Sequence, residues 1–383
     1  MRHTSLIIAV FALSSGCAQY YDVDEACHDK VPGEKHANDK AEGDFIWRTN
    51  CYRRLMGLPR MGFDKAVQQA TENHLAYMAT NHSLATLPAN WADENLALPS
   101  ATGATIFDRL EHAGYGDVEA VGGSSGIWMW AFFDTFVGAQ KVDFWMYDPG
   151  ARELLLQPSM IDMGYAELPD WPNDGSAEPF LWNLSHANLI FEYPATARET
   201  KPITYPKDGQ LEVPYVYRGP FDCEEERGFP ITVTVGSTEA GEDFQSLGAN
   251  PYALEWVNAT LIGPDGAIPV DLQGPSDDDP FGSSVAFTVV ATPTLPLSPK
   301  TTYTFLGTVS WNVNEVDVEM EFTTRKDDNR PQMDLTCEDL GYIDKGALGT
   351  GGGTTTGSTT TGTTTTPPVY TYYGFYTYPT GTP

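Results

Sequence analysis

The chain has 383 residues and carries 52 acidic side chains against 22 lysines and arginines, a formal net charge of −30. This charge argues against a nucleic acid partner and against electrostatic adhesion to anionic lipid headgroups, since both are negatively charged. Roughly 330 residues separate a hydrophobic leader from a low-complexity tail, which is enough for two domains with cores of their own.

Residues 1–16 form a basic start followed by a short apolar run, which predicts a secretory signal peptide and is too short to span a bilayer. The run ends in Ser14-Ser15-Gly16-Cys17, which resembles a bacterial lipobox whose cysteine becomes lipidated. Ser14 stands where such boxes usually carry leucine, so a plain cleaved signal stays open. We expect Cys17 to attach the chain to the outer membrane through acyl chains; otherwise the protein is secreted.

Four further cysteines follow at Cys27, Cys51, Cys223 and Cys337. An even number of thiols in an oxidising compartment predicts disulfides, and four thiols allow three pairings. Proximity in the sequence favours Cys27 with Cys51 and Cys223 with Cys337. Because no two of these cysteines have CxxC spacing, we expect no thiolate metal site. Nothing in the sequence resembles a P-loop or a dinucleotide fingerprint, so we expect no cofactor.

The first domain is expected over residues 38–200, after a linker at 17–37. A helix should begin at Phe63-Asp64 and end near Asn81. Its buried stripe follows the i, i+3, i+4, i+7 spacing through Val67, Ala70, Thr71, His74, Leu75 and Met78. A capping box at Thr105 to Asp108 predicts a second helix that stops at Gly114. The aromatic stretch from Trp128 to Met146 predicts a third helix, and a short strand is expected at 163–166.

The second domain is expected over residues 201–340, where the apolar period changes from helical to two. The clearest strand alternates Val316, Val318, Met320 and Phe322 with acidic residues. Further strands are expected at 231–235, 258–262, 267–272, 285–291 and 302–311, with a Gly263-Pro-Asp-Gly266 turn between the second and third of these. Several short strands without helices predict an immunoglobulin-like sandwich.

Residues 341–383 are expected to be a disordered tail. A Gly/Thr run from Gly346 leads into a Tyr-rich end, and the run cannot bury enough apolar area to offset the entropy of ordering it. A Tyr-rich end that binds a surface polymer or a partner is the alternative.

Five motifs occur in the order found in bacterial CAP domains: Asn50-x2-Arg53-x3-Gly57-Leu58-Pro59, His74-x2-Tyr77-Met78-Ala79-x-Asn81, Thr102-Gly103-Ala104-Thr105-x2-Asp108-Arg109, Trp145-Met146-x2-Pro149-Gly150-x-Arg152 and Met163-Gly164-Tyr165. The first domain thus resembles the CAP superfamily, which includes the cysteine-rich secretory and pathogenesis-related proteins. The resemblance implies an α+β chain: a CAP-type α-β-α sandwich followed by an all-β Ig-like sandwich, as in certain bacterial lipoproteins.

CAP domains typically hold two histidines and two acidic residues in a cleft, often able to bind a divalent metal. By this resemblance, the histidine of the W-M-x-x-P-G-H-R pattern falls on Ala151. The histidine of an H-x-E group falls on Ala92, whereas its carboxylate is kept as Glu94. Glu119 matches the acid of the family's G-E-N segment. The resemblance therefore implies a cleft with two acids and no imidazole.

Other histidines offer weak substitutes. His74 lies on the apolar stripe of its helix and is expected to be a hydrogen-bonded core residue. His82 and His112 stand near the C-terminal ends of their helices, where an imidazole interacts favourably with the helix dipole. A replacement metal site built from His82, His112 and Glu94 is the less favoured alternative.

These observations predict a binding or scaffolding protein of the cell envelope that acts without catalysis on an unidentified envelope or extracellular ligand. One rival hypothesis is a metal-assisted hydrolase that uses Glu94 and Glu119. The other is a lipid or sterol carrier, which would need an apolar groove beside the aromatic segment.

Overall fold

The computed structural model describes residues 20–28, 41–82, 93–116, 121–132, 138–158, 160–171, 182–192, 202–217, 226–234, 254–274, 288–311, 314–327 and 371–372. The predicted signal peptide, Cys17, Ala92, Glu119, Cys223 and Cys337 lie outside these residues. No helix among the described residues is long and apolar enough to cross a membrane.

The N-terminal half is built on one five-stranded sheet, sheet A, with the strand order β1-β3-β4-β2-β14. Its strands are β1 (Gly62–Phe63), β2 (Val121–Phe132), β3 (Met160–Trp171), β4 (Trp182–Glu192) and β14 (Thr371–Tyr372). β1 runs parallel to β3, and the other neighbours are antiparallel.

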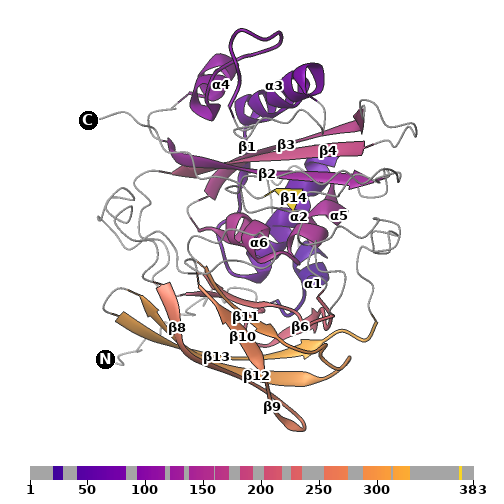
Figure 1. The fold of residues 1–383 in the computed structure, drawn as a ribbon, viewed down its shortest axis with the longest axis vertical. Coiled ribbons are helices and arrows are strands. Elements are labelled where there is room, and N and C mark those ends of the chain that lie inside the picture. The colour runs from indigo at the N-terminus through magenta and orange to yellow at the C-terminus, as the bar shows by residue number, and fades with distance from the viewer. Residues whose placement is uncertain are drawn as a thin grey trace, which may run out of the picture.

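Helices cover both faces of sheet A and make three layers (Figure 1). α3 (Lys65–Asn81) and α4 (Ile106–Ala113) lie on one face, and α2 (Ala41–Leu55), α5 (Ala139–Trp145) and α6 (Pro149–Leu156) lie on the other. Close packing of α3 on the sheet requires a glycine on β3, because a Cβ added at Gly164 would lie 2.6 Å from Thr71 Oγ1. This arrangement agrees with the mixed helix and sheet class predicted for the first domain.

The predicted helix ends at α3 and α4 are confirmed. Asp64 caps α3 by accepting hydrogen bonds from the backbone of Ala66 and Val67. Thr105 and Asp108 form the predicted capping box of α4, and Gly114 ends the helix in the left-handed conformation with φ 84°. These short-range signals are read correctly from sequence because each uses residues within one turn.

The predicted helix from Trp128 to Met146 is wrong over its first part. Val121–Phe132 is strand β2, which pairs with β4, and only Ala139–Trp145 is helical. Trp128, Trp130 and Phe132 recur with period two, the spacing of a strand, and aromatic side chains favour strands. Strand β4 was also missed, although it pairs with both β2 and β3 at the centre of the sheet.

The C-terminal half forms two further sheets, as the period of two predicted. Sheet B has the order β10-β11-β7-β5, and sheet C has the order β6-β13-β12-β8-β9. Their bounds are β5 (Ile203–Tyr205), β6 (Gln210–Val213), β7 (Ile231–Thr234), β8 (Leu254–Gly263), β9 (Gly266–Ile268), β10 (Val270–Gln273), β11 (Thr288–Pro293), β12 (Thr302–Trp311) and β13 (Asn314–Thr324). The predicted turn closes a hairpin in which Gly263 is the partner of Gly266.

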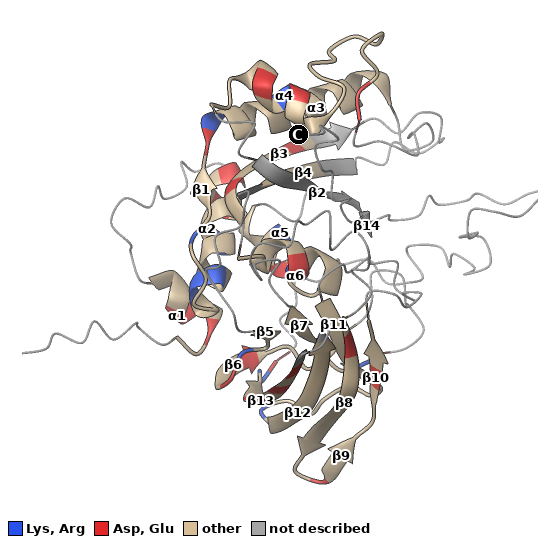
Figure 2. Ribbon diagram, turned by 90° about the vertical axis from the view of Figure 1, so that its left-hand side faces the viewer, with Lys and Arg blue, Asp and Glu red and all other residues tan. Residues whose placement is uncertain are grey.

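The two halves share one apolar cluster, which runs from α2, α5 and α6 into sheets B and C. Figure 2 shows the resulting stack, in which α2, α5 and α6 lie between sheet A and the two C-terminal sheets. Aromatic pairs cross the junction: Tyr52 lies 6.3 Å from Tyr205, and Tyr147 lies 5.5 Å from Phe229, between ring centroids. The halves are therefore packed against each other through an apolar interface.

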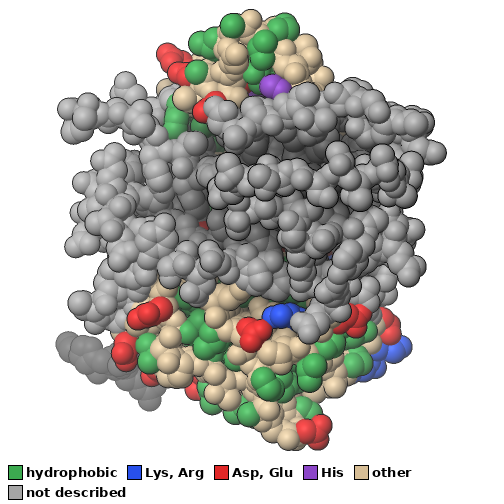
Figure 3. Space-filling view, viewed as in Figure 1, with side chains coloured by type: hydrophobic (Ala, Val, Ile, Leu, Met, Phe, Trp, Pro, Cys, Tyr) green, Lys and Arg blue, Asp and Glu red, His purple; other side chains and the backbone are tan. Residues whose placement is uncertain are grey.

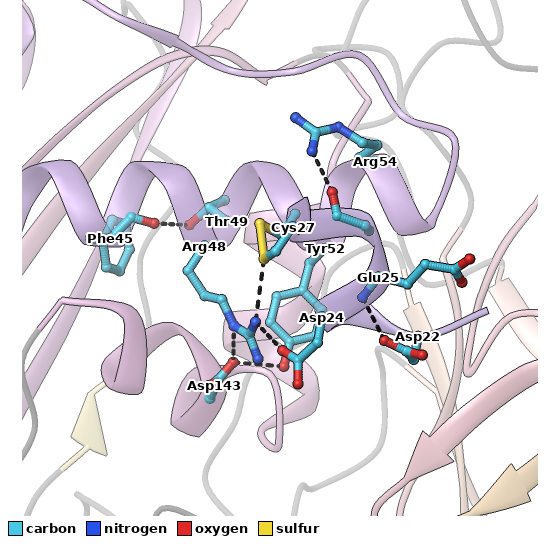
Figure 4. The surroundings of a disulfide bond; sticks show 12 residues. Asp22, Asp24, Glu25, Cys27, Phe45, Arg48, Thr49, Tyr52, Arg54 and Asp143 are labelled. Carbon is cyan, nitrogen blue, oxygen red and sulfur yellow. Dashed lines mark hydrogen bonds and ion pairs between the residues drawn. A yellow bond between two sulfur atoms is a disulfide. The ribbon is translucent and has the colours of Figure 1, made fainter. Parts of the chain in front are cut away.

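The N-terminal segment joins the two halves from the outside. Helix α1 (Val23–His28) falls within the segment expected to be a linker, and the predicted disulfide between Cys27 and Cys51 ties it to α2. Figure 4 shows Arg48 beside this disulfide, within reach of Asp24 and Asp143 at 2.7 and 2.6 Å. Just before α1, the carbonyl of Tyr21 accepts a 2.7 Å hydrogen bond from the backbone of Leu211 in β6. One short segment thus contacts both halves.

Candidate functional site

Glu94, the acid expected in the family cleft, is only 4% exposed and is held from several directions. One carboxylate oxygen lies 2.8 Å from His74 Nδ1 on α3. The other accepts hydrogen bonds from the backbone N–H groups of Thr102 and Gly103 at 2.6 and 3.2 Å. A carboxylate with this set of donors is positioned as a structural acceptor, because both of its oxygens are already bonded.

The segment around Glu94 is fastened to α3 by two more residues of the same motif. The hydroxyl of Tyr77 accepts a 2.9 Å hydrogen bond from the backbone of Asn95. The side chain of Asn81 donates to the carbonyl of Pro99 at 2.8 Å. His74, Tyr77 and Asn81 recur on one side of α3, so the His-x2-Tyr-x3-Asn spacing holds a loop against this helix.

The segment around Glu94 is also held from the side of α4, by the Thr102-Gly103 and Asp108-Arg109 motifs. We call this segment, with the residues of α3 and α4 that hold it, the loop clamp. Gly103 is required there because a Cβ at this position would lie 2.5 Å from the backbone nitrogen of Arg109. Arg109 is buried, and its Nε lies 3.8 Å from Glu94 Oε1. Burial lowers the pKa of Arg109 to about 10, and the charge of Glu94 opposes this shift. The guanidinium therefore stays charged at neutral pH and balances the buried carboxylate.

A second imidazole lies next to this clamp. His186 on β4 is buried, and its ring centroid lies 5.5 Å from that of His74 in an edge-on arrangement. Asn188, two residues along the same strand, donates to Thr71 Oγ1 on α3 at 3.0 Å. Alternate residues of β4 therefore place a polar row beneath α3.

Ala151 lies on the opposite face of sheet A, in helix α6. Its side chain is 0% exposed and belongs to the apolar cluster shared by the two halves. Asp148 caps the helix, and its carboxylate accepts the Ala151 N–H at 2.9 Å. The backbone N–H of Ala151 is therefore already bonded to Asp148, and the side chain is packed in the core.

Arg152, next to Ala151, joins α6 to the C-terminal half. Its guanidinium lies over the rings of Tyr205 and Phe229, at 4.8 and 4.6 Å from their centroids. It donates to the carbonyls of Met146 and Pro230 at 2.8 Å each. Burial lowers the pKa of Arg152 to about 10, which leaves the side chain protonated at neutral pH. The last residue of the Pro-Gly-x-Arg motif is therefore an interdomain contact.

Arg53 in α2 acts in a similar way within the N-terminal half. It is 0% exposed and donates to the carbonyls of Pro59, Leu155 and Gln157 at 2.7 to 2.9 Å. Neighbouring Asn50 exchanges two hydrogen bonds with the backbone of Met61. The first motif therefore fixes the turn after α2 and the end of α6.

The other predicted site residues are dispersed. His82 is the C-cap of α3, and its ring lies 5.5 Å from that of Tyr77. His112 is exposed in the last turn of α4. Ala92 and Glu119 fall outside the described residues. Among the residues that are described, no group of three or more His, Cys, Asp or Glu side chains could hold a metal ion.

A further polar cluster lies on the α5 side of sheet A. The ammonium of Lys141 contacts Ser185 Oγ and lies 3.3 Å from Glu167 Oε1. Both Lys141 and Ser185 are fully buried. Lys141 therefore donates to the Ser185 hydroxyl and pairs with the Glu167 carboxylate, and these two contacts compensate its burial.

Sequence reasoning missed that His74 and Arg109 are the side-chain partners of Glu94, and it missed the contact made by Arg152. The Asp108-Arg109 and Arg152 motif positions were visible, but their partners lie on other elements. One usable signal was the polar pair His186 and Asn188 at a spacing of two in an otherwise apolar run.

Comparison with known proteins places this geometry in a family context. No curated protein matches the chain. Residues 47–176 match the family model described as CAP: Cysteine-rich secretory protein family, and this match takes in α3, α4, α5, α6 and the loop clamp. The match stops before β4 and the C-terminal sheets. Residues 47–176 of the chain are therefore similar to the CAP family.

Proposed function

We propose that this chain is an exported CAP-domain protein of the cell envelope that binds or positions a partner without catalysing a reaction. The observation that carries this proposal is that the Glu94 carboxylate is buried and fully hydrogen-bonded. Its carboxylate is 4% exposed and bonded to His74, Thr102 and Gly103. A carboxylate that must hold a loop in place is poorly suited to bind a metal or transfer a proton to a substrate.

The second support is the position of Ala151. An alanine replaces the imidazole that the family resemblance implies, and its side chain is packed in the core. Binding needs shape and hydrogen-bond complementarity, whereas metal-assisted hydrolysis also needs an accessible ligand set. We therefore place the role of the CAP domain in recognition or scaffolding, and describe its cleft as degenerate.

For location, we propose attachment to the outer membrane through lipidated Cys17, because the leader and the Ser-Ser-Gly-Cys sequence resemble those of bacterial lipoproteins, apart from Ser14. We further propose that the C-terminal sheets form an Ig-like sandwich.

Strand β13 presents the exposed row Glu315, Asp317, Glu319 and Glu321. Figure 3 shows acidic and hydrophobic side chains at this end, with few basic ones. Such a surface disfavours nucleic acid.

Calorimetric titration of zinc into the metal-stripped full chain tests the proposal against its rival, a hydrolase using Glu94 and Glu119. We expect no stoichiometric binding at micromolar zinc, for the wild-type chain and for Glu94→Gln. Glu111→Gln, at an exposed position on α4, is the matched control for loss of one acid. A stoichiometric micromolar site in the wild-type chain would contradict a non-catalytic, metal-free domain.

A further inference from the structure

The N-terminal segment (residues 20–28) covers part of one sheet edge in the C-terminal half, and we call this segment the N-terminal strap. The carbonyl of Tyr21 accepts a 2.7 Å hydrogen bond from the amide of Leu211 in β6, which is the edge strand of sheet C. The Tyr21 ring lies against Gly209, where an added Cβ would lie 3.2 Å from Tyr21 Cε1. The backbone of β6 is therefore shielded from water at Leu211 by the strap.

The strap is held on α2 by covalent and polar contacts, with little apolar burial. Cys27 is joined to Cys51 by the disulfide, and the guanidinium of Arg54 donates to the carbonyl of Ala26. Of the six residues of α1, Ala26 alone is buried. A helix this short is not stable by itself, because isolated helices below about 12 residues are marginal in water. The position of the strap therefore depends on the disulfide.

The two sulfur atoms of this disulfide differ in access and in surroundings. Cys51 is fully buried in α2, whereas Cys27 is partly exposed. The Arg48 guanidinium donates to Cys27 Sγ at 3.4 Å, and Asp24 and Asp143 hold this guanidinium beside the sulfur (Figure 4). A cation beside a cysteine favours its thiolate, and a thiol that ionises more readily is a better leaving group in thiol–disulfide exchange. An incoming thiol can therefore reach Cys27, and Cys27 is suited to leave as a thiolate.

We propose that the Cys27–Cys51 disulfide is a redox-sensitive switch that releases the strap from the β6 edge, and that its reductant is a dithiol. One thiolate of the dithiol attacks Cys27 Sγ and breaks the bond to Cys51, whose sulfur takes up a proton. The second thiolate of the dithiol then attacks the dithiol sulfur bound to Cys27 and expels the Cys27 thiolate beside Arg48. The dithiol loses two electrons and two protons as it closes its own disulfide, and the two cysteines gain them.

Reduction should open the strap without separating the two halves of the molecule. Lys207 donates to the carbonyl of Leu55 in α2 at 2.9 Å, and Arg152 lies 4.8 Å from the ring centroid of Tyr205. Neither contact involves the strap, so both persist after reduction. The amide of Leu211, in contrast, loses its acceptor and becomes accessible to water.

Hydrogen exchange of the full chain, before and after treatment with dithiothreitol in the absence of denaturant, tests the switch. We expect alkylation and mass spectrometry to show that Cys27 and Cys51 become reduced, and the Leu211 amide to exchange roughly tenfold faster or more, with the amides of β12 unchanged. A disulfide that stays intact in millimolar dithiothreitol would overturn the proposal. So would reduction that leaves exchange at Leu211 unchanged, or that accelerates exchange equally in β12.

Cys27→Ser with Cys51→Ser is the matched control, because it removes this disulfide and keeps the other cysteines. The Leu211 amide of this variant should exchange at the rate of the reduced wild-type chain, with or without dithiothreitol. Acceleration by dithiothreitol in this variant would assign the effect to the other cysteines and would overturn the proposal.

Discussion

The two faces of sheet A place charged residues of the CAP-like motifs in different surroundings. On the α3 and α4 face, the buried carboxylate of Glu94 gathers donors from His74, Thr102 and Gly103. On the α6 face, the buried cation of Arg152 gathers acceptors and two aromatic rings. The first arrangement holds a loop to two helices, and the second holds one domain to another.

This comparison shows that charged motif residues can have a structural role that does not depend on any reaction. Both charges are buried, and a buried charge is tolerated only when it is compensated by partners. Once Glu94 and Arg152 carry this structural role, their identities are constrained whether or not a reaction takes place. The motif residues therefore predict the fold better than they predict an activity.

The largest loss of stability is expected when Arg152, on the α6 face, is replaced. Arg152→Met should lower the free energy of unfolding by ~3–5 kcal/mol, because buried carbonyls lose a charged donor and the rings of Tyr205 and Phe229 lose the cation. Arg152→Lys should recover only part of this loss, since an ammonium cannot reproduce the planar fork. Urea unfolding of the full chain measures the free energy lost in each of the two variants. Once the Arg152 contact is removed in Arg152→Met, the two halves should unfold in separate transitions.

Arg60→Ala is the control, because Arg60 is exposed and surface changes stay within ~0.5 kcal/mol. An effect of Arg152→Met no larger than that of Arg60→Ala would show that the interdomain contact contributes little.

A smaller effect is expected when the family residue is restored at Ala151. Ala151→His inserts an imidazole into packed core and should destabilise the chain by ~1–3 kcal/mol without adding zinc affinity. Thermal unfolding with and without zinc measures both quantities. A rise in melting temperature on adding zinc to this variant would mean that the position faces an accessible site.

The smallest expected effect is on the pH dependence of stability, and it concerns Tyr205 at the contact with Arg152. Burial raises the pKa of Tyr205, and the nearby charge of Arg152 opposes this shift. The unfolded chain therefore loses this proton first as the pH rises above about 10, so the contribution of Tyr205 to stability is lost there. Below that pH both states keep the proton.

Tyr205→Phe keeps the ring beneath Arg152 and removes only the titrating group. Its unfolding free energy should fall less steeply between pH 9.5 and 11, by less than ~1 kcal/mol relative to wild type. The buried phenol of Tyr165 titrates in both proteins and cancels in the difference. The pKa of Tyr52 is raised in part by Tyr205, so Tyr205→Phe lowers that pKa shift as well and acts in the same direction. Parallel pH profiles for the two proteins would contradict a raised pKa at Tyr205.

Sequence reasoning predicted the features that depend on nearby residues. The caps of α3 and α4, the hairpin turn after β8 and the disulfide of Cys27 with Cys51 all involve short separations. It failed at β2, where aromatic content was read as helix although the period was two. It also gave no indication that β14 would pair with β2 across more than two hundred residues, because strand partners at this separation leave no local pattern.

The candidate site was predicted less well than the fold. Glu94 was selected as an acid of the cleft, but its bonding depends on α3, the loop and α4 meeting in space. Ala151 was selected as a deleted imidazole, whereas its complete burial follows from the packing of the two halves. The bonding of Glu94 and the burial of Ala151 cannot be read from the spacing of residues in the sequence, because both arise from tertiary contacts.

Hydrogen exchange at the backbone amides of Thr102 and Gly103 tests the central claim most directly, that Glu94 holds the loop and does not serve a reaction. We expect both amides to be strongly protected in the wild-type chain and to exchange at least a hundredfold faster in Glu94→Ala, with β3 amides unchanged as the internal control. Fast exchange of Thr102 and Gly103 in the wild-type chain would show that the Glu94 carboxylate is free, and would contradict the structural role assigned to it.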